Sequence, residues 1–232
     1  MPEPLRIGFL LYPELDQLDV TGPYEVFTRM PETEVYLAAR SLAPVRADSG
    51  LRLLPTTTLD TCPPLALLCV PGGLGVGAVL SDPMYLAFLR RMAAGARYVT
   101  SVCTGALALG AAGLLAGRHA TTHWLSRPLL PAFGAELVDK RVVVDGPLIT
   151  GGGVTAGIDF ALRVVAELHG TALAEAIQLA IEYNPDPPFS AGSPASAGPE
   201  VVADVEAAAR QRMRRLAEQV DRAAAALSAS AT

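Results

Sequence analysis

A cysteine at the junction of a buried strand and a helix is the residue best placed for nucleophilic chemistry. Residues 98–102 are typical of a short strand, and residues 104–112 have the composition and spacing of a helix, so Cys103 lies at the turn between them. In a parallel sheet such a turn faces the carboxyl edge, where α/β proteins bind ligands. The partial positive charge of a helix N-terminus favours a thiolate, so we expect the pKa of Cys103 to be lowered.

The other two cysteines lack these features. Cys62 lies in a loop before Pro63, and Cys69 lies inside a strand, so neither has a helix start beside it. We expect both to be structural thiols. Three cysteines without metal-type spacing predict neither a disulfide framework nor a zinc site, so we expect no metal.

A carboxyl group can reach the same edge of the sheet from the first strand. Asp19 follows the strand expected at residues 5–12 and precedes the helix expected from Thr21, so it could converge on Cys103. A partly desolvated carboxyl beside a thiolate has a raised pKa and can deliver a proton at neutral pH. The alternative is that Asp19 only caps the helix, a role that Asp16 or Thr21 could also fill.

A glycine-rich segment, residues 71–77, directly follows the strand expected at residues 65–70. No Lys-Ser/Thr pair comes after it, so its match to a phosphate-binding loop is weak. We expect Gly72 and Gly73 to let backbone N–H groups approach a substrate as anion-stabilising donors. Leu74 belongs to the same predicted substrate-binding segment.

Thr104, and not a histidine, lies next to Cys103. A Cys-His hydrolase needs a base within hydrogen-bonding reach of its thiol. His119 and His123 flank a Thr-Thr pair, and His169 follows a predicted helix. We expect core or surface roles for the histidines, although His123 could approach the thiol in space.

Strands and helices alternate along most of the chain. Strands are expected at residues 5–12, 35–39, 65–70, 98–102, 141–145 and 148–150, and helices at residues 21–27, 85–94, 104–112, 155–168 and 171–183. Such alternation predicts an α/β fold with a doubly wound, mostly parallel sheet, and residues 1–183 as one catalytic domain.

The C-terminal region has a different organisation. Residues 184–199 are rich in Pro, Ser and Gly and predict a connector, and residues 200–232 predict one amphipathic helix. Its apolar seam comprises Val202, Val205, Ala209, Met213, Leu216, Val220, Ala223 and Leu227. Such a seam must pack on the body or on a second subunit, and the long connector favours a homodimer with exchanged helices.

Charge and hydropathy narrow the possible partners. The net charge of -5 comes without a basic cluster, so we expect no nucleic-acid partner. The N-terminus shows none of the basic region, long apolar core and cleavage site of a secretory signal, so we expect a cytoplasmic protein. No apolar stretch reaches the roughly 18 residues that span a bilayer, so we expect no membrane partner.

Several segments together resemble the ThiJ/PfpI superfamily, which is similar to the class I glutamine amidotransferases, over about residues 5–200. They are residues 17–23 (QLDVTGP), 70–73 (VPGG), 101–105 (SVCTG), 120–124 (ATTHW) and 150–160 (TGGGVTAGIDF). With residues 184–194 after them, their order is similar to that of the bacterial isocyanide hydratases in this superfamily.

The resemblance implies a flavodoxin-like sheet with the cysteine at a strained elbow, and a dimer. It implies that Cys103 is the nucleophile, that Asp19 is the acid and that Thr104 helps to organise the site. Val154 falls on an apolar position beside the pocket, where an isoleucine would be expected. The implied reaction needs no cofactor and adds water to an isocyanide, giving an N-substituted formamide.

A binding function is the alternative. AraC-type regulators carry a similar N-terminal module, so a non-catalytic, ligand-sensing module remains open, as does a redox sensor that uses the Cys103 thiolate. Only about 30 residues follow the connector, too few for the pair of helix-turn-helix units of such regulators.

Overall fold

The computed structural model describes residues 3–230, and its centre is a seven-stranded sheet in the order β10-β11-β7-β6-β1-β2-β5. Its strands are β1 (Leu5–Leu10), β2 (Thr33–Ala39), β5 (Thr57–Thr58), β6 (Leu67–Val70), β7 (Tyr98–Ser101), β10 (Val142–Asp145) and β11 (Leu148–Gly151). Neighbouring strands are parallel except for β10 and β11, which are antiparallel. The predicted mostly parallel α/β sheet is confirmed.

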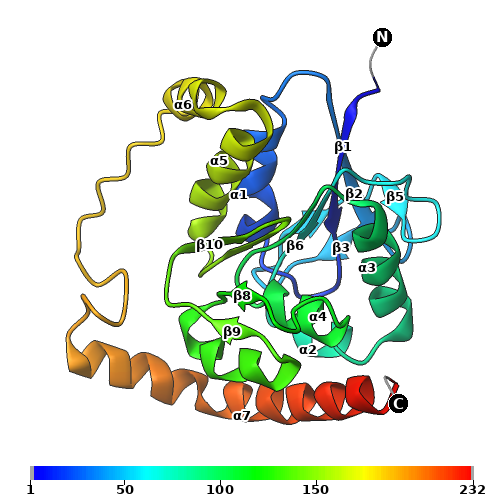
Figure 1. Ribbon diagram of the computed structural model, residues 1–232. Helices are drawn as coiled ribbons and strands as arrows, with labels where there is room; N and C mark the ends of the chain where they lie inside the picture. The colour runs from blue at the N-terminus through cyan, green and yellow to red at the C-terminus, as the bar shows by residue number, and fades with distance from the viewer. Residues whose placement is uncertain (1–2, 231–232) are drawn as a thin grey trace.

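Helices cover both faces of the sheet. Helices α1 (Leu18–Phe27) and α5 (Ala156–His169) lie on one side, and α3 (Pro83–Gly95) and α4 (Gly105–Ala111) lie on the other (Figure 1). The central strands are therefore apolar on both faces, and Phe9 of β1 and Leu67 of β6 are fully buried.

Helix α1 begins three residues earlier than the sequence indicated. It starts at Leu18, whose N–H donates to Asp16 Oδ1 at 2.9 Å, so Asp16 satisfies a free N–H group of the first turn. The expected start at Thr21 was wrong because Pro23 was assigned to the first turn and in fact lies within the helix. Asp19 consequently belongs to the first turn of α1.

Smaller elements complete the carboxyl edge of the sheet and the connections. They are the pairs β3 (Val45–Arg46) with β4 (Arg52–Leu53) and β8 (His119–Ala120) with β9 (Glu136–Leu137), and the helices α2 (Val76–Val79), η1 (Trp124–Phe133) and α6 (Thr171–Ala180). The 3-10 helix η1 contains two prolines and ends at Gly134, whose φ of 73° is in the left-handed region that glycine readily adopts.

The C-terminal helix α7 (Pro199–Ser230) lies along the lower edge of the molecule in Figure 1, after an exposed connector. It packs against η1, α4 and α2. Exchange of this helix between two subunits stays a prediction. Its buried residues are Ala209, Leu216, Val220 and Ala223. The predicted apolar seam begins at Val202, but Val205 is 43% exposed, and the first buried residue of α7 is Ala209.

No helix within residues 3–230 has both the length and the apolar character required to cross a bilayer.

Candidate active site

Cys103 occupies a strained turn between β7 and α4. Its φ of 55° lies in the left-handed region, which costs a residue with a side chain about 1 kcal/mol or more and needs support from its surroundings. The Cys103 N–H donates to Gly152 O at 2.8 Å and to Gly151 O at 3.2 Å. The buried Thr122 hydroxyl donates to Cys103 O at 2.6 Å. Hydrogen bonds on both sides of the residue therefore hold the elbow.

Asp19 lies in the buried floor beneath this elbow. Its side chain is fully buried, and Oδ2 accepts a hydrogen bond of 2.7 Å from the Gly72 N–H. Within residues 3–230, Oδ1 receives no hydrogen bond from a nitrogen or oxygen donor. The carboxyl group of Asp19 therefore accepts from Gly72 and does not cap α1, and its role as the acid of the site stays a prediction.

Burial is the main reason that the pKa of Asp19 is raised well above its ordinary value. The charge of Asp16 adds to this, while the Gly72 N–H and a hydrogen bond with the Cys103 thiol act in the opposite direction. Because the net shift is upward, Asp19 can keep a proton at a pH where an exposed aspartate has lost it.

The pKa of Cys103 is raised as well, contrary to the lowered pKa that the sequence predicted. The residue is only 6% exposed, and burial raises the pKa of its thiol, followed by the negative charge of Asp19. The N–H and hydroxyl of Thr104, at the start of α4, lower the pKa but do not offset these effects. The helix N-terminus is thus outweighed by burial and a nearby carboxylate.

The N–H groups of Gly72 and Gly73 do not face a substrate, which corrects the expectation that they act as anion-stabilising donors. Gly72 donates to Asp19, and Gly73 donates to Thr104 Oγ1 at 3.0 Å. A Cβ atom on Gly72 would lie 2.5 Å from the backbone nitrogen of Thr104 and 2.9 Å from Cys103 Cβ. The glycines are needed because the two turns approach each other closely.

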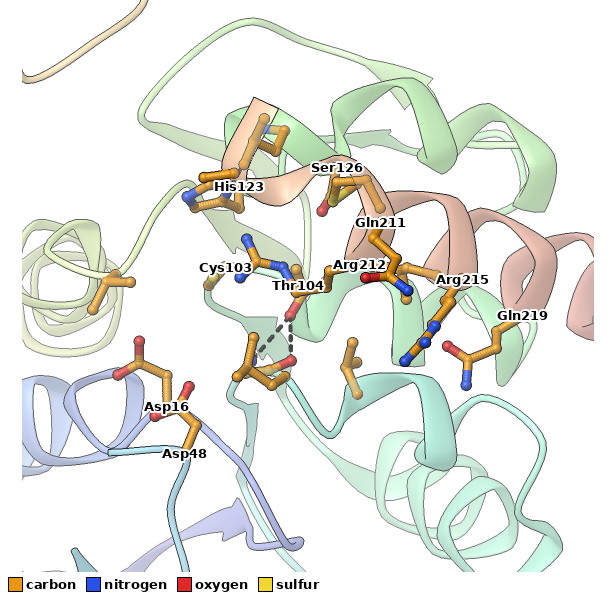
Figure 2. A pocket seen from close by; sticks show the side chains of 18 residues that line it. Asp16, Asp48, Cys103, Thr104, His123, Ser126, Gln211, Arg212, Arg215 and Gln219 are labelled. Atoms are coloured by element: carbon orange, nitrogen blue, oxygen red, sulfur yellow. Dashed lines mark hydrogen bonds between the residues drawn. The ribbon is translucent and has the colours of Figure 1, made fainter. Parts of the chain in front are cut away.

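A pocket of about 550 Å³ opens above Cys103 and has the size of a small-molecule site (Figure 2). Of the predicted residues, Cys103, Thr104, Gly73, Leu74 and Val154 line it. Asp19 and Gly72 do not line it.

Helix α7 forms one wall of this pocket. The sequence did not indicate that this helix contributes to the site. The wall consists of Ala208, Gln211, Arg212, Met213, Arg215, Leu216 and Gln219. The regular seam of α7 indicated packing, but nothing in the spacing of its polar residues indicated a ligand site. Asp48, on the opposite side of the pocket from α7, gave no sequence signal either (Figure 2).

His123 also lines the pocket. Burial lowers its pKa, and the charges of Arg212 and Arg127 lower it further, so the imidazole is neutral at pH 7. Its Nδ1 accepts a hydrogen bond from the Leu125 N–H at 3.3 Å, which leaves the proton on Nε2. His123 is therefore present as a hydrogen-bond donor, and it is not arranged as a base for Cys103.

The remaining cysteines are unpaired and buried, in agreement with structural roles. Burial raises the pKa of Cys62 to about 11 and that of Cys69 to about 12, so both stay protonated. In the part of the chain that the structure describes, no cluster of three His, Cys, Asp or Glu side chains is arranged to hold a metal ion.

The doubly wound sheet with a buried cysteine elbow defines the class of this protein. The profile of the DJ-1/PfpI family matches residues 5–167, and the chain belongs to that family. It is 53% identical to the isonitrile hydratase of Pseudomonas putida, over 96% of this chain and 98% of the relative. A ThiJ/PfpI family protein from Pseudomonas syringae has a similar structure, with a TM-score of 0.91 and 44% identity over 94% of this chain and 90% of that one.

Other relatives match only part of this chain. DJ-1beta of Drosophila melanogaster has a TM-score of 0.71 and 24% identity, over 77% of this chain and 98% of its own. The transcriptional regulator GbdR of Pseudomonas aeruginosa is 29% identical over 75% of this chain but only 49% of its own length.

Proposed function

We propose that the chain is an isonitrile hydratase, which adds water to R–N≡C and releases the formamide R–NH–CHO. The observation that carries this proposal is the buried pair of Cys103 and Asp19 beside a small-molecule pocket. The identity of 53% to the Pseudomonas putida isonitrile hydratase over nearly the full length of both chains supports the substrate class.

The first step begins with a single proton shared between the Cys103 thiol and the Asp19 carboxylate. Transfer of the Cys103 proton to Asp19 gives a thiolate and a carboxylic acid, and both raised pKa values keep the proton within the pair. The thiolate attacks the terminal isonitrile carbon, and that carbon takes the proton from Asp19. The product is a thioimidate, R–N=CH–S–Cys103, beside an ionised Asp19.

The second step consumes water. The Asp19 carboxylate removes a proton from the attacking water, whose oxygen bonds to the thioimidate carbon, and the proton passes to the imine nitrogen. The adduct R–NH–CH(OH)–S–Cys103 collapses as its hydroxyl proton returns to Asp19 and the thiolate leaves. This regenerates the starting pair and releases the formamide, so the sum is the addition of one water.

The remaining residues would hold the site and the organic group R. The Thr104 hydroxyl accepts from the Gly73 N–H, and the two contacts between these residues are drawn in Figure 2. We assign them the role of fixing the turn beside Cys103. The side chains of Leu74 and Val154 supply apolar contacts for R at the pocket wall.

The test is to incubate the purified chain with cyclohexyl isocyanide in water enriched in oxygen-18. Mass spectrometry should detect N-cyclohexylformamide that carries one labelled oxygen and accumulates over many turnovers. Formation no faster than in a protein-free control would contradict the proposal. Such a failure, accompanied by peroxide oxidation of Cys103, would favour the redox-sensing alternative.

We also propose that the protein is cytoplasmic and forms a homodimer. Each chain would consist of a catalytic domain (1–183), a connector (184–199) and a C-terminal helix (200–232). The unpaired thiols suit a reducing compartment, and Leu179 and Phe189 are 82% and 80% exposed. Light scattering should give twice the chain mass, and a monomer would contradict the dimer.

Exchange of α7 between subunits has a separate test. Because a Cβ atom added to Gly77 would meet the Gln219 side chain, a Gly77→Cys/Gln219→Cys variant can be oxidised and run on a denaturing, non-reducing gel. A disulfide within one chain migrates as a monomer, whereas exchanged helices give a covalent dimer.

A further inference from the structure

Helix α7 lies outside residues 5–167, the part of the chain that the profile of the DJ-1/PfpI family matches. DJ-1beta of Drosophila melanogaster and the oxidised DJ-1 of Toxoplasma gondii match 77% and 78% of this chain while using 98% and 100% of their own. Each of these matches therefore leaves more than a fifth of this chain uncovered. The isonitrile hydratase of Pseudomonas putida matches 96% of this chain, so its match must extend into α7.

Because Cys103 and Asp19 belong to the domain that these relatives share, α7 adds nothing to the reacting pair itself. It adds a wall that faces the part of the pocket in which the organic group R of the substrate would lie. Met213 and Leu216 give this wall apolar surface, while Gln211, Arg212 and Arg215 give it hydrogen-bond donors. Such a wall discriminates among substituents of the substrate and leaves the chemistry at the isonitrile carbon unchanged.

Arg212 is the charged side chain of this wall that reaches deepest into the site. Figure 2 shows it extending from α7 toward the part of the pocket that holds Cys103. Its charge acts on both sides of the pocket, because it lowers the pKa of His123 and counters the upward shift that burial causes in Asp48.

Arg212 and Arg215 have no salt bridge among the ion pairs within residues 3–230. Arg127 and Arg141, by contrast, each pair with an aspartate. The guanidinium groups on the pocket wall are therefore available for a ligand. An arginine that is free to bind favours a carboxylate, which it can hold through two parallel hydrogen bonds.

We propose that α7 is the substrate-specificity wall of the site and that Arg212 selects isonitriles whose organic group carries an anionic substituent such as a carboxylate. This inference rests on the proposed hydratase function. Asp16 and Asp48 lie on the side of the pocket away from α7 (Figure 2), so the same charge pattern turns the anionic end of R toward the arginines.

The test compares 4-isocyanobenzoate with 4-isocyanobenzamide, which has nearly the same shape but no charge. We expect the ratio of their kcat/KM values to favour the carboxylate in the unaltered protein and to fall about tenfold or more in Arg212→Gln, which is about 1.4 kcal/mol. The matched control is Arg210→Gln, because Arg210 is an exposed arginine of α7 that does not line the pocket, and its ratio should equal that of the unaltered protein.

A second readout does not require turnover. Calorimetry of the formamide product, 4-formamidobenzoate, should show about tenfold weaker binding to Arg212→Gln than to Arg210→Gln. An equal Kd for the two variants, or an unchanged kcat/KM ratio in Arg212→Gln, would overturn the inference. Absence of all turnover with intact binding would instead contradict the hydratase function and leave the role of Arg212 supported.

Discussion

The Asp19 carboxylate raises the pKa of the Cys103 thiol, while a hydrogen bond from that thiol lowers the pKa of Asp19. Burial is the main cause of the raised pKa values of both groups, so the two together hold one proton over a wide pH range. Nucleophile and acid are thus prepared by a single proton transfer. This arrangement explains how a protonated, buried thiol can still react.

Replacement of Asp19 by asparagine removes the proton donor and keeps the shape. We expect Asp19→Asn to lower turnover of cyclohexyl isocyanide by about 100-fold or more, the scale on which a general acid acts. Asp16→Asn removes a nearby charge but keeps the pair, so its loss should be less than tenfold. Equal losses in the two variants would show that charge in the pocket, and not the Asp19 proton, matters.

The same substitution has a predictable effect on stability. A carboxyl whose folded pKa is raised favours the folded state at low pH, and that contribution is lost as the pH rises through the folded pKa. Asp19→Asn cannot ionise, so its Tm should equal or exceed that of the unaltered protein, with a difference that grows with pH. A melting curve series from pH 5 to pH 9 measures this, and a lower Tm at high pH would contradict it.

Alkylation reports the influence of Asp19 on the thiol directly. Because the Asp19 charge raises the pKa of Cys103, the pH midpoint of iodoacetamide modification should be lower in Asp19→Asn than in the unaltered protein. Cys62 and Cys69, with pKa values of about 11 and about 12, should react little near neutral pH. Peptide mass mapping assigns the modified residue, and an unchanged midpoint would mean that the two groups do not interact.

Thr122 is expected to position Cys103. Thr122→Val keeps the size of the buried side chain but removes the hydrogen bond to the Cys103 carbonyl, which helps to hold its φ of 55°. We expect kcat to fall about tenfold, because small displacements of a nucleophile are costly. Thr122→Ser retains the hydroxyl and should recover most of the rate, whereas equal rates for the two variants would exclude the role of the hydrogen bond.

The position of Cys103 was predictable because it depends on local sequence. A buried strand before it and a run of Ala and Leu after it determine the turn, and the alternation of elements determines the sheet. The start of α1 was not predictable in the same way, because Pro23 fits either the first turn or a later position. The hydrogen bond that the Leu18 N–H donates to Asp16 Oδ1 places the helix start at Leu18.

Other features of the site depend on contacts between distant segments. The pKa of Cys103 is raised mainly by burial and then by the charges of Asp19 and Asp16, whereas the helix N-terminus alone predicted the opposite direction. The wall formed by α7 depends on where a long connector returns the chain. The seam through Leu216 and Val220 predicted that α7 packs, but it did not indicate what lies beneath the helix.

In the proposed reaction the Cys103 sulfur forms a covalent bond with the isonitrile carbon, and turnover by Cys103→Ala tests this step. Product formation from cyclohexyl isocyanide should fall to the protein-free rate, while the melting curve confirms that the variant is folded. Formation of N-cyclohexylformamide by Cys103→Ala at a rate comparable to that of the unaltered protein would show that Cys103 is not the nucleophile.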